Sequence, residues 1–158
     1  MKVKGIIDED FINYKKPSMI IEFPYCNFKC DKECGRAICQ NSPLTKIPNI
    51  EISYQKLAER YLNNGITEAI VCQGLEPLDS FDELYEFVLL LRDEYHCNDD
   101  IIIYTGYNKE EISDYIRKLS LLMNIIIKYG RYIPDQVPHR DNILGVDLAS
   151  DNQYAEKL

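Results

Sequence analysis

The chain alternates between short, continuous apolar runs and longer segments whose apolar residues recur every three or four positions. Continuous apolar runs bounded by turn residues are typical of strands that are buried on both faces of a sheet. The runs that predict strands are residues 18–24, 68–73, 100–104, 124–128 and 143–148. Residues 1–16 are mixed and acidic, and we interpret Asp8-Glu9-Asp10 as a solvated turn.

Amphipathic helices are predicted between these strands, because apolar residues recur there on one helical face. Ser80-Phe-Asp-Glu83 and Asn108-Lys-Glu-Glu111 have the spacing of capping boxes, which begin helices. The predicted helices are residues 50–64, 81–95 and 109–119. Strands that alternate with helices in this way indicate an α/β fold with a mostly parallel sheet built from right-handed βαβ units.

Length and charge limit the class of protein. A chain of 158 residues is long enough to bury a core without disulfides, so we expect a single domain over residues 1–158. The N-terminus has no apolar signal segment, and no apolar run approaches the roughly 20 residues of a membrane span. We therefore expect a cytoplasmic protein. A net charge of −8 and the absence of a basic tract argue against nucleic acid or an anionic membrane as partner.

Four of the six cysteines lie close together, directly after the first confident strand. In a reducing compartment, clustered cysteines more often bind metal or take part in redox chemistry than form structural disulfides. Cys26 and Cys30 are followed by two candidates for a third ligand, Cys34 and Cys39. From the residues alone, the cluster could hold iron and sulfide with three or four cysteine ligands, or a structural zinc ion.

The loops that follow three of the predicted strands carry the unusual residues of the chain. The cysteine segment follows the first strand, Gly74-Leu-Glu-Pro77 follows the second, and Thr105-Gly-Tyr107 follows the third. In parallel sheets, ligands bind beyond the carboxyl ends of the strands. The sequence therefore predicts one site that is built from all three loops.

Four motifs in these loops carry a resemblance to a known family. They are Cys26-x3-Cys30, Cys39-Gln-Asn41, Gly74-Leu-Glu-Pro77 and Tyr104-Thr-Gly-Tyr107. In this order they resemble the radical S-adenosylmethionine superfamily and, more narrowly, the activating enzymes of anaerobic ribonucleoside-triphosphate reductase. The resemblance extends from about residue 19 to 153. It implies a radical S-adenosylmethionine core, that is, an open, partial TIM-like barrel of mostly parallel strands with flanking helices.

The resemblance also implies the cofactors. In the family, three cysteines hold a [4Fe-4S] cluster, and S-adenosylmethionine chelates the iron that has no protein ligand. The third cysteine of these activases is followed by one residue and then asparagine, as in Cys39-Gln-Asn41. The implied ligands are therefore Cys26, Cys30 and Cys39, and Cys34 is the alternative.

Further residues and partners follow from the same resemblance. Gly74, Leu75 and Glu76 stand where the family binds the methionine amino group, and Thr105 and Asn152 are the other implied cofactor contacts. Leu75 departs from the glycine that is usual at its position, and leucine does not easily adopt a positive φ.

The implied enzyme has no catalytic side chain of its own, because cluster and cofactor supply the reactivity. It generates a glycyl radical on a partner protein, anaerobic ribonucleotide reductase, with electrons from a flavodoxin-like or similar donor. Two alternatives remain open at the level of sequence. One is a radical enzyme that acts on another peptide or a small molecule, and the other is a zinc-stabilised interaction module.

Overall fold

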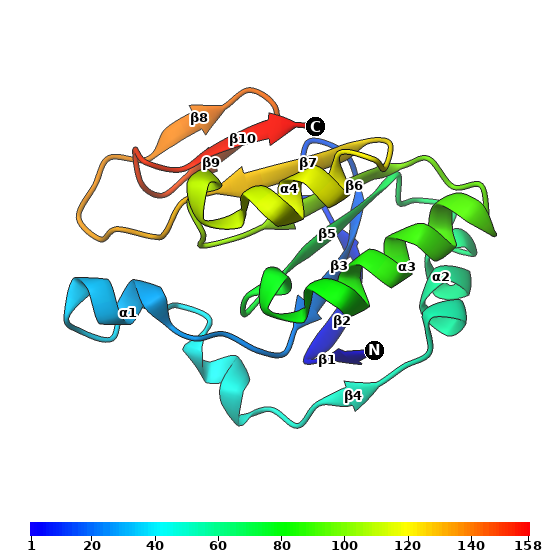
Figure 1. Cartoon of the computed structure of the whole chain (residues 1–158), viewed down its shortest axis with the longest axis horizontal. Coiled ribbons are helices and arrows are strands. Elements are labelled where there is room, and N and C mark those ends of the chain that lie inside the picture. Colours follow the sequence, from blue (N-terminus) through cyan, green and yellow to red (C-terminus); the bar gives the residue numbers. More distant parts are fainter.

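The computed structural model describes residues 1–158 as one open sheet with helices packed against one of its faces (Figure 1). Six strands form the sheet in the order β10-β7-β6-β5-β3-β2. The four inner strands are parallel to one another: β3 (Ser18–Phe23), β5 (Ala69–Gly74), β6 (Asp100–Tyr104) and β7 (Ile125–Tyr129). The antiparallel edge strands are β2 (Gly5–Asp10) and β10 (Tyr154–Lys157).

The two faces of the sheet are covered differently. Since successive side chains of a strand point to opposite faces, Met19 and Ile21 join the core on the helical side, whereas Ile20 joins a second core on the other side. The first core contains 23 buried residues and the second only nine, so most of the apolar burial lies under the helices. Those helices are α2 (Tyr54–Leu62), α3 (Phe81–Asp93) and α4 (Ser113–Leu119).

No helix covers the second face of the sheet. The buried side chains that close it come from loops and a hairpin, namely Tyr14, Leu144 and Leu148. The hairpin consists of β8 (His139–Asp141) and β9 (Val146–Leu148), which pair with each other and not with the main sheet. The predicted strand over residues 143–148 is thus correct only for its second half, because residues 142–145 form the turn of this hairpin.

The sheet is mixed α/β and mostly parallel, as predicted, but it is not closed. Both edges carry antiparallel strands, β2 and β10, and neither edge bonds to the other. A TIM-like barrel is therefore not confirmed. The sequence prediction overlooked both edge strands because they are polar: Asp8 to Asp10 lies in β2, not in a turn, and Asp8 pairs with Arg60 at 2.6 Å.

The predicted helices are present with corrected starting points. Residues 50–53 are not helical, since β4 (Ile50–Glu51) pairs with β1 (Lys2–Val3), and α2 begins after Ser53, whose hydroxyl accepts a hydrogen bond from the Lys56 N–H. No helix of the chain has the length and apolar character needed to cross a membrane.

Only one of the two predicted capping boxes forms. At Asn108 both reciprocal hydrogen bonds are present, and the chain continues through the 3₁₀ turn η3 (Lys109–Ile112) into α4. At Ser80 the hydroxyl makes no capping bond, because the 3₁₀ turn η2 (Pro77–Ser80) runs directly into α3. The Glu83 carboxylate instead accepts a hydrogen bond from the Lys2 N–H.

Candidate iron-sulfur and cofactor site

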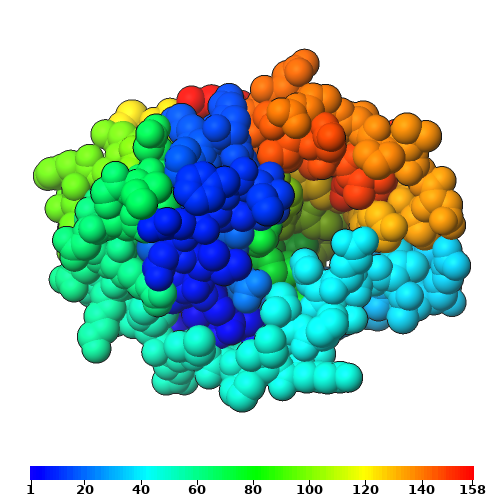
Figure 2. All heavy atoms as spheres, turned by 180° about the vertical axis from the view of Figure 1, so that it is seen from behind, coloured from blue at the N-terminus to red at the C-terminus, as the bar shows by residue number.

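A cavity of about 360 Å³ lies at the carboxyl ends of the four parallel strands. Figure 2 shows its mouth as a hollow between the N-terminal segment (blue), the cysteine segment (cyan) and the segment around the β8–β9 hairpin (orange). The three predicted loops converge on it, as the parallel sheet requires. The lining residues that the sequence singled out as site candidates are Cys26, Cys30, Cys39, Gly74, Leu75, Glu76 and Thr105.

The four clustered cysteines do not all face this cavity. Cys26, Cys30 and Cys39 line it, whereas Cys34 is exposed and lines a neighbouring cavity of about 280 Å³. Asn152 lines that neighbouring cavity too, so the structure does not bring it to the main one. The Asn152 amide instead donates to the Arg131 carbonyl at 3.0 Å.

The local fold explains why Cys34 is set apart. Cys30 lies in the first turn of the short helix α1 (Lys29–Cys34), and Cys34 is its last residue. The helix starts after Phe28 and ends at Gly35, and both residues have left-handed backbone angles, with φ of 55° and 68°. Gly35 turns the chain back, so that Cys39 returns to the cavity that Cys30 lines.

Burial favours the neutral form of two of these thiols, Cys26 and Cys30. Burial raises the pKa of Cys26 to about 12, although the Phe28 N–H donates to its sulfur at 3.2 Å and opposes the shift. Burial also raises the pKa of Cys30. No three thiol, imidazole or carboxylate groups are gathered closely enough to hold a single metal ion. Because thiolates are the ligands, metal binding would release protons from these thiols.

The donor set fits an iron-sulfur cluster better than a structural zinc ion. Three thiols on one cavity would supply three protein ligands to a four-iron cluster, which would leave one iron without a cysteine ligand. A structural zinc site needs four ligands around one point, and the fourth cysteine here faces the neighbouring cavity. Cys26, Cys30 and Cys39 would hold the cluster.

Glu76 links the second loop to the third. Its side chain is only 5% exposed, and its carboxylate accepts hydrogen bonds from the Leu78 N–H (3.1 Å), the Thr105 hydroxyl (2.8 Å) and the Gly106 N–H (2.9 Å). Burial raises the pKa of Glu76 to about 7, and the three donors oppose that shift. With its oxygens engaged by the protein, Glu76 positions the two loops relative to each other.

Gly74 has the backbone conformation that the turn at the start of the second loop requires. Its φ is 95°, and a Cβ at this position would lie 2.9 Å from the Glu22 Cα and from the Phe23 nitrogen. Leu75 has no positive φ, so leucine is compatible with its position and the departure from the family pattern causes no strain there. The Gly74 carbonyl accepts a hydrogen bond from the Asn41 amide at 2.6 Å.

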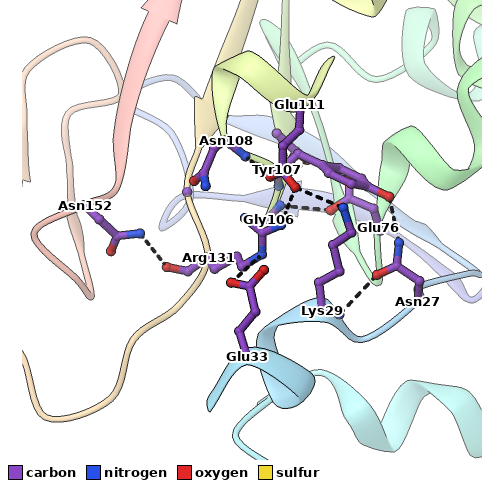
Figure 3. Close-up of polar contacts among 12 residues, drawn as sticks. Asn27, Lys29, Glu33, Glu76, Gly106, Tyr107, Asn108, Glu111, Arg131 and Asn152 are labelled. Atoms are coloured by element: carbon purple, nitrogen blue, oxygen red, sulfur yellow. Dashed lines mark hydrogen bonds and ion pairs between the residues drawn. The ribbon is translucent and has the colours of Figure 1, made fainter. Parts of the chain in front are cut away.

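A second set of contacts joins the first loop to the third (Figure 3). The Tyr107 hydroxyl donates to Asp79 at 2.6 Å and accepts from the Asn27 amide at 2.7 Å. The Asp79 carboxylate also accepts from the Asn27 N–H at 3.0 Å. Since Asn27 follows Cys26 directly, this network fixes the loop that carries the first thiol.

Sequence reasoning missed the polar side chains that the strands themselves present to the cavity. Gln73, Tyr104 and Lys128 line it from β5, β6 and β7, and Tyr104 is paired in register with Lys128. Lys128 is 7% exposed, and its ammonium donates to the Gly130 carbonyl at 2.9 Å. Burial lowers the pKa of Lys128 to about 8, against the opposing charges of Glu76 and Cys30. The available signal was a lysine that interrupts the apolar run from Ile125.

Comparison with known proteins supports an iron-sulfur cluster. Residues 19–153 match the family model described as a 4Fe-4S single cluster domain. No match was found among curated proteins or among solved structures. The matched segment covers most of the chain and contains every lining cysteine. The chain therefore belongs to the family of 4Fe-4S single cluster domains.

Proposed function

We propose that this protein is a radical S-adenosylmethionine enzyme that generates a glycyl radical on a partner protein, anaerobic ribonucleotide reductase. The observation that carries the proposal is that three thiols share one cavity with the Gly74–Glu76 turn. When bound, the cofactor would chelate one iron of the cluster through its amino and carboxylate groups, and the pair would supply the radical chemistry that removes a hydrogen atom from the glycine Cα.

The chain's own residues would bind and orient the cofactor. Gly74 and Leu75 line the cavity, and their backbone carbonyls would accept from an ammonium group, the Gly74 carbonyl in addition to its bond from the Asn41 amide. Lys128 lines the same cavity from β7, which is separated from β5 by β6. Its ammonium would pair with a carboxylate. A methionine moiety carries both groups, so these residues would hold it in one orientation. Thr105 and Glu76 would keep the two loops in register.

The open cavity favours a protein as substrate. Its mouth lies between three surface segments and is not roofed by a helix, so an extended peptide can approach the carboxyl edge of the sheet (Figure 2). The backbone of a glycine loop has no side chain to exclude it from such an opening. A flavodoxin-like protein or a similar one-electron donor would reduce the cluster.

The test is anaerobic reconstitution with iron and sulfide, followed by EPR of the dithionite-reduced protein with and without S-adenosylmethionine. The proposal expects a [4Fe-4S]⁺ signal that shifts when the cofactor is added, and 5′-deoxyadenosine as a product. It also expects a glycyl radical signal when the reductase is present. A protein that binds one zinc ion and takes up no cluster would overturn the proposal. A cofactor-cleaving protein that leaves the reductase unmodified would restrict it to another peptide or small molecule.

A further inference from the structure

The segment between the second and third lining cysteines is closed by one carboxylate. Asp31 directly follows Cys30, and its Oδ1 accepts hydrogen bonds from the backbone N–H groups of Ile38 and Cys39, both at 2.9 Å. Asp31 is half-buried, whereas residues 32–37 between the two ends are exposed. The residues that separate the two cysteines therefore form a solvated excursion whose ends are joined at Asp31.

The helix that carries Asp31, α1, is itself fixed to the rest of the protein by ion pairs. In Figure 3, Lys29 and Glu33 of α1 reach toward Glu111 and Arg131. Lys29 pairs with Glu111 at 2.9 Å, and Arg131 pairs with Glu33 at 3.2 Å and with Glu111 at 2.7 Å. The Arg131 side chain is buried, so this network joins α1 to the loop that follows β7.

Cys39 is held from its other side as well. Two residues beyond it, the Asn41 amide bonds to the Gly74 carbonyl at the end of β5. The third thiol thus lies between a tether to α1 and a tether to the sheet. Without the first tether, only the contact from Asn41 would hold Cys39 toward the cavity, and Cys34 is nearer to Cys30 along the chain.

The tether also affects the charge around the thiol. In iron-sulfur sites, hydrogen bonds to the sulfurs and nearby charge set the reduction potential. Here the Cys39 N–H is engaged by a carboxylate and is not available to a cluster sulfur. A negative charge close to the ligand also disfavours the addition of an electron. Both effects lower the potential.

We propose that Asp31 is a positioning residue, which selects Cys39 as the third cluster ligand and lowers the reduction potential of the cluster. This inference rests on the proposed cluster, but not on cofactor cleavage or on the identity of the partner. It assigns a role to a residue that neither binds iron nor lines the cavity.

The test compares Asp31→Ala and Asp31→Asn after anaerobic reconstitution, each with Cys34 intact and with Cys34→Ala. Asparagine keeps an Oδ1 acceptor for both N–H groups and removes the charge, whereas alanine removes both. Glu33→Gln is the matched control, because it neutralises a carboxylate of the same helix that pairs with Arg131 but accepts no N–H from the excursion, so it reports the effect of lost charge and of a weaker α1 anchor without loss of the tether. Circular dichroism verifies that each variant is folded.

We expect Asp31→Ala to lose its cluster to a chelator roughly tenfold faster than wild type, the usual scale for loss of an outer-shell contact. In that background, Cys34→Ala should abolish the cluster, although it has no effect in the wild-type background. Asp31→Asn should retain the cluster and shift its midpoint potential to a more positive value by more than Glu33→Gln does.

Unchanged chelator resistance in Asp31→Ala would overturn the positioning role, and equal potentials in Asp31→Asn and wild type would overturn the electrostatic role. The proposed function fails separately from this inference. A wild-type protein whose cluster ignores S-adenosylmethionine contradicts the function and leaves the role of Asp31 open to the same measurements. A wild-type protein that takes up no cluster overturns both.

Discussion

The helical face of the sheet carries most of the apolar core, and the opposite face carries the polar residues of the cavity. On the helical face, side chains such as Ile101 and Ile103 of β6 pack against α3 in the larger core. On the other face, β6 and β7 carry near their ends the polar residues Tyr104 and Lys128, which line the cavity. A buried polar row contributes little to folding unless its groups are paired. The difference shows that the helical face stabilises a fold whose opposite face is free to bind ligands.

The largest effect is expected from a cavity in the helical core. Phe87 of α3 is 0% exposed, and truncation of a buried phenylalanine to alanine costs about 3–5 kcal/mol of unfolding free energy. We expect Phe87→Ala to lower the urea midpoint strongly, while the folded fraction still takes up the cluster. A loss of less than about 1 kcal/mol would contradict the assignment of this face as the main source of stability.

Glu76 both lines the cavity and holds two loops together, so its removal should have an intermediate effect on the free energy of unfolding. Glu76→Ala leaves the Thr105 hydroxyl and the Gly106 N–H without their acceptor, at a cost of about 1–3 kcal/mol. Hydrogen exchange at Gly106 should become faster. Glu76→Gln retains one carbonyl acceptor and serves as the control, and its loss should be smaller. Equal losses in the two variants would show that the charge, and not the hydrogen bonding, holds the loops.

Lys128 should separate binding from stability. Lys128→Met removes a buried charge, so we expect unchanged or higher stability. Its affinity for S-adenosylmethionine should fall by roughly tenfold or more, since a hydrogen bond to a charged group contributes about 1.5–3 kcal/mol. Equilibrium dialysis against the anaerobic cluster-loaded protein measures this affinity. Lys56→Met, at an exposed position of α2, is the control and should bind as wild type does.

The same residue predicts a pH dependence. Because burial lowers the pKa of Lys128 to about 8, its ammonium is present below that pH and is lost above it. Affinity for the carboxylate of the cofactor should therefore decline as the pH rises through about 8. The decline should be absent in Lys128→Met. A decline of equal size in both proteins would assign the titration to another group.

The smallest effect is expected at the surface of the cysteine segment. Lys29 and Glu111 are partly exposed, and ion pairs of this kind contribute about 0–1 kcal/mol. Lys29→Met should change the unfolding free energy by less than about 1 kcal/mol in physiological salt. A larger loss would indicate that α1 depends on this pair more than on the buried Arg131, and thermal unfolding at low and high salt distinguishes the two.

Much of the fold could be predicted from sequence because the inner strands are buried on both faces. The runs at residues 18–24, 68–73, 100–104 and 124–128 each correspond to a parallel strand, displaced by no more than one residue at either end. The edge strands β2 and β10 could not be recognised in this way, since polar residues interrupt both and β10 has only four residues. Their pairing depends on neighbours that are distant in sequence.

The candidate site was predictable to the extent that it lies in loops. The parallel arrangement brings the ends of β3, β5 and β6 together. Seven candidate residues from the three loop motifs therefore line one cavity. Lys128 was not predicted, because the face to which a strand residue points is defined only by the register of the sheet. The bond from the Cys39 N–H to Asp31 was not predicted either, since it depends on the path of an exposed turn.

The hydrogen bond from Asn41 to the Gly74 carbonyl makes the two halves of the site thermodynamically dependent on each other. This carbonyl lies at the turn where the ammonium group of a methionine ligand would bind, and the amide that occupies it belongs to the loop of the third cysteine. Any ligand that strengthens or breaks this bond changes the free energy with which that loop is seated. Linkage is reciprocal, so loading the metal must change the affinity for the ligand by the same factor. The coupling between cluster and ligand would thus pass through one amide and one carbonyl.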